Sequence, residues 1–101
     1  MDILQNIKQI VADNSPQEAL EKMQPLIDAL KMEENHNSRG EALLAAVLAE
    51  KGKLLWKTGD RAGAISAYEE SAQEDPGGPG ALLLEHTREI MDFFDPNQLN
   101  P

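Results

Sequence analysis

Apolar residues recur along this chain at spacings typical of amphipathic helices. Near the N-terminus they follow steps of one, three and four residues, at Ile3, Leu4, Ile7, Ile10 and Val11, with polar residues between them. Similar patterns return downstream. They predict five helices, over residues 3–13, 16–30, 42–56, 61–74 and 79–94.

Turn-forming residues separate these segments. Ser15-Pro16-Gln17-Glu18 is typical of a capping box at the start of the second helix, and Ser38-Arg39-Gly40-Glu41 suggests another before the third. Pro25 lies inside the second helix, where we expect a kink because proline removes one backbone hydrogen bond. The polar run 31–40 separates the second helix from the third.

The turns at residues 14–15 and 59–60 are short, and short turns join antiparallel helices. Leu and Ala dominate the apolar residues, while Val and Thr are scarce, which disfavours strands. We therefore expect one all-α domain over residues 1–94, followed by a flexible tail, 95–101. Residues 1–37 form a first hairpin, 38–76 a second, and 79–94 a closing helix.

The stretch from Gly52 to Pro76 has the layout of a tight helical hairpin. Gly52 and Ala64 are small enough to let two helices approach closely, and Tyr68 then fills the space beyond them. Gly59 allows the positive φ that reverses the chain, and Asp60 caps the next helix. Pro76 ends that helix.

This layout resembles the tetratricopeptide repeat (TPR), a helix–turn–helix unit of about 34 residues. The resemblance covers about residues 45–79. The matching residues are Gly52, Gly59, Asp60, Ala64, Tyr68, Ser71, Ala72 and Pro76. The family favours Trp, Leu and Tyr where this chain has Leu48, Lys51 and Leu55. The resemblance implies a right-handed superhelical stack of hairpins.

A weaker copy of the pattern occurs near the N-terminus. Aligning residues 15–27 with 60–72 places Ala19 on Ala64 and Met23 on Tyr68. We therefore interpret the first hairpin as a degenerate repeat and the last helix as a cap.

Composition and charge narrow the functional classes. The 18 acidic and 9 basic residues leave a net charge of −9, which argues against binding nucleic acid or an anionic membrane. The chain has no cysteine, so disulfides and thiolate chemistry are unavailable. Neither a signal peptide nor a membrane-spanning apolar run is apparent, which favours a cytoplasmic protein.

Repeats of this family generally bind peptides on the face lined by the first helix of each hairpin. The resemblance implies that Ala46, Ala49, Lys53, Trp56 and Lys57 line this groove. The alternative is that Lys53 and Lys57 pair with acids of the chain itself while Trp56 packs on the first helix. The lysine–asparagine clamp of some chaperone-binding members is not supported, because Ala49 and Lys53 stand at its positions.

Other residues offer weaker candidates for chemistry. His86 and Glu89 lie one helical turn apart, yet His36 has no evident reason to join them as a metal ligand. Asp92 and Asp95 are typical of solvated charges, and Gly77-Gly78-Pro79-Gly80 lacks the Lys-Ser/Thr of a phosphate loop. We expect no catalytic site, metal or cofactor.

The sequence therefore predicts a non-catalytic protein–protein interaction module with an unidentified protein or peptide partner. An alternative is a homodimer formed through apolar residues of the last helix, such as Leu83, Phe93 or Phe94. A second alternative is a metal-dependent enzyme that uses His86 and Glu89.

Overall fold

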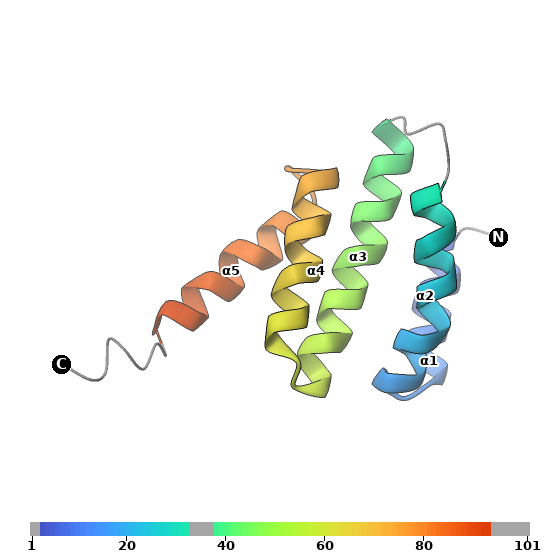
Figure 1. Cartoon of the computed structure of the whole chain (residues 1–101), viewed down its shortest axis with the longest axis horizontal. Helices are drawn as coiled ribbons and strands as arrows, with labels where there is room; N and C mark the ends of the chain where they lie inside the picture. The colour runs from blue at the N-terminus through green and yellow to red at the C-terminus, as the bar shows by residue number, and fades with distance from the viewer. Residues whose placement is uncertain (1–2, 33–37, 94–101) are drawn as a thin grey trace.

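The computed structural model of the chain describes residues 3–32 and 38–93. Five α-helices account for almost all of them: α1 (Ile3–Asp13), α2 (Pro16–Met32), α3 (Ser38–Thr58), α4 (Arg61–Glu74) and α5 (Pro79–Phe93). Helix α3 lies at the centre, with α2 on one side and α4 on the other, and α5 leans away beyond α4 (Figure 1). The expected all-α fold with five helices is confirmed.

Two apolar clusters lie on either side of α3. The larger is formed by α1, α2 and α3, and its buried members are Ile7, Ala19, Met23, Ile27, Leu30, Leu44, Val47, Leu48 and Leu54. The smaller joins α4 to α5 through Ala64, Tyr68 and Leu84, with Leu55 and Trp56 of α3 packed against it. Helix α3 therefore contributes to both clusters, which explains why its apolar residues form a long stretch rather than one narrow stripe.

The turn between α1 and α2 lies where the sequence predicts it, with one of the two hydrogen bonds of the expected capping box. The Asn14 side chain donates to the carbonyl of Ile10 at 2.8 Å, which satisfies a carbonyl of the last turn of α1. The hydroxyl of Ser15 accepts from the backbone N–H of Glu18 at 3.3 Å. Pro25 is exposed inside α2, and the helix continues past it to Met32.

The turn between α3 and α4 also confirms its prediction. Gly59 has a φ of 92°, and its N–H donates to the carbonyl of Trp56 at 3.1 Å. The side chain of Asp60 accepts from the N–H of Gly63 at 2.9 Å and so caps α4. These two residues reverse the chain and pair one carbonyl of the last turn of α3 and one N–H of the first turn of α4.

Helix α4 ends at Glu74, two residues before Pro76, as expected. The buried hydroxyl of Ser71 in α4 donates to the carbonyl of Ala45 in α3 at 2.6 Å. A Cβ at Gly80, in the first turn of α5, would overlap the side chain of Ser71. Gly80 therefore lets α5 approach α4 at Ser71, the residue whose hydroxyl is hydrogen-bonded to α3.

The close approach of α3 and α4 differs from its prediction in one detail. The three heavy atoms nearest to a Cβ built on Gly52 all belong to the ring of Tyr68, and its Cδ1 would lie 2.6 Å away. Ala64 is fully buried, but it is Tyr68 that occupies the space above Gly52. The missing side chain of Gly52 thus makes room for an aromatic ring.

The two hairpins share features at the positions that the sequence aligns. Ser15 and Asp60 each accept a hydrogen bond from the N–H three residues later, at Glu18 and Gly63. At the next aligned positions Ala19, Met23 and Ala64 are 0% exposed and Tyr68 is 3% exposed. At these four pairs of aligned positions the two hairpins are therefore similar in capping and burial. The expected tail, 95–101, lies outside the described residues.

Candidate functional site

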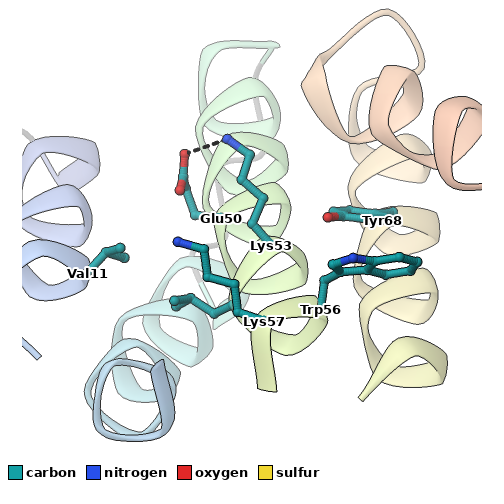
Figure 2. A pocket seen from close by; sticks show the side chains of 7 residues that line it. Val11, Glu50, Lys53, Trp56, Lys57 and Tyr68 are labelled. Atoms are coloured by element: carbon teal, nitrogen blue, oxygen red, sulfur yellow. Dashed lines mark hydrogen bonds and ion pairs between the residues drawn. The ribbon is translucent and has the colours of Figure 1, made fainter. Parts of the chain in front are cut away.

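A pocket of about 280 Å³ opens over the C-terminal half of α3. Val11 of α1 lies at one side and Tyr68 of α4 at the other, and α3 supplies the residues between them (Figure 2). The α3 residues that line it are Glu50, Lys53, Leu54, Trp56 and Lys57. Spacings of three and four residues place these side chains on neighbouring positions of the helix surface.

The pocket has an apolar floor. Leu54 and Tyr68 are each only 3% exposed. Leu54 belongs to the larger apolar cluster and Tyr68 to the smaller one. Val11 and Trp56 are half-buried and present part of their apolar surface to the pocket. Since three helices hold these residues, the apolar surface is formed before any ligand binds.

Charged side chains form the rim. Lys53 pairs with Glu50, its Nζ 3.3 Å from Oε1, and both ammonium groups extend toward Glu50 in the view of Figure 2. Within residues 3–32 and 38–93, Lys57 has no ion-pair or hydrogen-bond partner for its ammonium group. The rim therefore holds two positive charges against one negative charge.

Tyr68 connects the floor to the rim. Burial of the phenol, and then the nearby negative charge of Glu50, raise the pKa of Tyr68 above its ordinary value of 10.0. The hydroxyl thus stays protonated at neutral pH and can donate a hydrogen bond. In the described part of the chain it has no hydrogen-bond partner.

Trp56 is fixed by residues of the second hairpin. The guanidinium carbon of Arg61 lies 5.1 Å from the centroid of its ring, within the range of a cation–π interaction. The indole also packs against the cluster that contains Tyr68. The alternative for this region was that Lys53 and Lys57 pair with acids of the chain and that Trp56 packs on the first helix. The pairing of Lys53 with an acid is confirmed, but Lys57 has no acidic partner in the described residues. Trp56 packs against the α4–α5 cluster.

The five expected groove residues separate into two groups. Lys53, Trp56 and Lys57 line the pocket, whereas Ala46 and Ala49 do not. Ala49 is 2% exposed and packs inside the fold, so it offers no surface to a ligand. It faces inward because α3 buries side chains in both clusters over this part of its length.

Sequence reasoning missed Val11, Glu50, Leu54 and Tyr68 as lining residues. Glu50, Leu54 and Lys57 follow one another at four- and three-residue steps, a signal that was available. The approach of Val11 depends on how α1 packs against α3, and no local pattern contains that information.

His86 and Glu89 do not line this pocket. His86 and Glu89 are exposed on α5, and no group of three potential metal-ligating side chains forms among the described residues. His36, Asp95 and the side chain of Asp92 lie outside the description. Gly78 is buried, and a Cβ built on it would overlap the side chain of Asp75. The absence of a side chain at Gly78 therefore allows the turn between α4 and α5 to pack closely.

No protein-family model matches this chain, and no curated protein or solved structure matches it either. None of the helices in the described residues is long and apolar enough to cross a membrane.

Proposed function

We propose that this chain is a non-catalytic binding module of TPR type that holds a segment of another protein in the pocket over α3. In this proposal α1–α2 and α3–α4 are successive repeats and α5 is the cap. The similar caps of Ser15 and Asp60, and the burial of both Met23 and Tyr68, support the pairing of the hairpins.

The observation that carries the proposal is the pairing of an apolar floor with an unpaired cation on rigid helices. Leu54, Trp56 and Tyr68 supply the floor, and Lys57 supplies the cation. A surface that is already ordered before binding favours affinity, because only the ligand then loses conformational freedom. The polar groups of the pocket are the ammonium groups of Lys53 and Lys57, the carboxylate of Glu50 and the hydroxyl of Tyr68. They can form hydrogen bonds or ion pairs with a ligand, which suits binding.

The size of the pocket favours a side chain of a larger partner over a free small molecule. Its volume of about 280 Å³ lies just below the range of about 300–1,000 Å³ that is common for small-molecule sites. One or two side chains of a peptide fill such a space, while the flanking peptide extends across α3.

Site-specific photocrosslinking tests this proposal. A photoreactive amino acid replaces Glu50 at the rim of the pocket in one variant and Asp28 in the other, so both variants keep Lys57. Asp28 is an exposed residue of α2 that does not line the pocket. We expect the variant at position 50 to crosslink to one contiguous segment of a partner in extract of the source cells. A synthetic peptide of that segment should then bind the purified protein and change the fluorescence of Trp56, the only tryptophan.

Equal crosslinking at positions 28 and 50, or a mapped peptide that leaves Trp56 fluorescence unchanged, would contradict the proposal. Light scattering over a dilution series addresses the alternative of a homodimer. Of the residues named for that alternative, Leu83 is half-buried against the α4–α5 cluster, and Phe94 and the side chain of Phe93 lie outside the described residues.

A further inference from the structure

We infer that the segment held over α3 carries an acidic side chain next to a large apolar side chain, and that Glu50 competes with this acid for Lys53. The inference rests on the proposed function and names the chemistry of its ligand. Lys57 receives the ligand's carboxylate, and the space between Val11 and Trp56 receives its apolar side chain.

The distribution of charge supports an acidic ligand. The chain has a net charge of −9, yet five of its nine basic residues lie between Arg39 and Arg61. Two of them, Lys53 and Lys57, reach the rim of the pocket, where Glu50 is the only acid among the lining residues. An otherwise acidic surface repels acidic peptides, so this rim is the place where such a peptide finds complementary charge.

The local contacts distinguish the two lysines. Lys57 has no partner for its ammonium group in the described residues, so a ligand carboxylate can bind it without displacing an internal acid. Lys53 already pairs with Glu50 at 3.3 Å. Glu50 therefore occupies a position that a ligand acid would otherwise take, and its charge repels that acid.

The floor of the pocket sets the second requirement. Val11, Leu54 and Trp56 offer apolar surface, and the unpaired hydroxyl of Tyr68 offers one donor beside it. Burying a large aliphatic or aromatic side chain here removes apolar surface from water on both partners, which favours binding. The Tyr68 hydroxyl is placed to donate to a carbonyl of the bound segment.

Selection from a library of random peptides tests this ligand class with purified protein. The library omits tryptophan, so that Trp56 alone reports binding to each enriched peptide. We expect the enriched peptides to share an Asp or Glu within two positions of a large apolar residue. Replacing that acid by its amide should weaken binding by about two- to fivefold, the range for one exposed ion pair.

Variants of the protein assign the effect to individual residues. Lys57→Gln should abolish the difference between each acidic peptide and its amide. Glu50→Gln should strengthen binding of the acidic peptides by about two- to fivefold, because it frees Lys53 and removes a repulsive charge. Arg39→Gln serves as the matched control, since it removes one positive charge from the same helix, about 27 Å from Lys57 along the axis.

The outcomes separate this inference from the proposed function. Enriched peptides that change Trp56 fluorescence but are neutral or basic would overturn the acidic ligand and leave the binding function standing. The same holds if Glu50→Gln weakens binding or Lys57→Gln and Arg39→Gln act alike. If the selection enriches no peptide that changes Trp56 fluorescence, the proposed function itself is contradicted.

Discussion

At the scale of single residues, α3 and α4 pack closely where Tyr68 lies against Gly52. The ring of Tyr68 in α4 lies where a side chain at position 52 would project. At this point the ring therefore packs directly against the backbone of α3. The presence of a small residue here was predictable from the sequence. Its partner was not, because the register of two packed helices depends on all their contacts together.

Gly52→Ala tests this contact. An added methyl group would overlap two ring carbons of Tyr68, which is buried, so the ring or the helix must shift. We expect a loss of about 1–2 kcal/mol in the free energy of unfolding. Overpacking costs about 1–3 kcal/mol, and the higher helix propensity of alanine offsets up to about 1 kcal/mol of it.

Urea denaturation followed by circular dichroism measures the change. Gly77→Ala is the control, because its nearest neighbour would be an oxygen of Asp75 at 4.0 Å and its φ is not positive. That variant should keep the wild-type free energy of unfolding or exceed it by up to about 1 kcal/mol. If both variants are equally stable, Tyr68 does not pack against Gly52.

The raised pKa of Tyr68 predicts a pH dependence at the same position. The folded protein holds the phenol proton more tightly than the unfolded chain, whose tyrosine has a pKa near its ordinary value of 10.0. The stability that results is fully present below this value and is lost as pH rises through the folded pKa. Tyr68 is the only tyrosine, so an ultraviolet titration of tyrosinate reports it alone.

The titration midpoint of the native protein should therefore lie above that of the urea-unfolded chain. Lysine side chains also titrate in alkali, so the variant Tyr68→Phe serves as a control in measurements of the free energy of unfolding. That free energy should fall less steeply with rising pH in Tyr68→Phe than in the wild type. Coincident midpoints for the folded and unfolded chains would show that Tyr68 is neither buried nor close to Glu50.

At the scale of the elements, the positions of the turns were the most predictable part of the fold. Ser15, Gly59 and Asp60 act through hydrogen bonds or a backbone angle within a few residues, so the local sequence contains the necessary information. The two apolar clusters were less predictable. Their division along α3 depends on which faces α2 and α4 cover, and this is settled only when the helices pack.

The cap of α4 allows a direct test at this scale. Asp60→Ala removes the acceptor for the N–H of Gly63, and we expect it to lower stability by about 1 kcal/mol. Thermal unfolding should show a decrease in Tm of about 4–8 °C for a domain of this size. Asp60→Asn keeps an acceptor and should unfold close to the wild-type temperature. If asparagine is as damaging as alanine, the charge of Asp60 matters rather than its cap.

At the scale of the whole molecule, the pocket forms where α1 and α4 flank the C-terminal half of α3. The resemblance to the tetratricopeptide repeat implied Lys53, Trp56 and Lys57 as groove residues on the first helix of the second hairpin. It placed Ala49 at the surface although α3 is covered from two sides there, and it could not place Val11, which comes from another hairpin. Contacts between hairpins are thus the part of the site that required the structure.

The most direct test of the central claim is to map a selected or crosslinked peptide on the protein by nuclear magnetic resonance. Titration into isotope-labelled protein should shift the amide signals of Val11, Lys53, Leu54, Lys57 and Tyr68 together, and the indole signal of Trp56. Signals of Asp28 and Met32, which are exposed on α2, should remain in place. Shifts centred on Leu82 and the exposed face of α5, with the pocket signals unchanged, would contradict binding over α3.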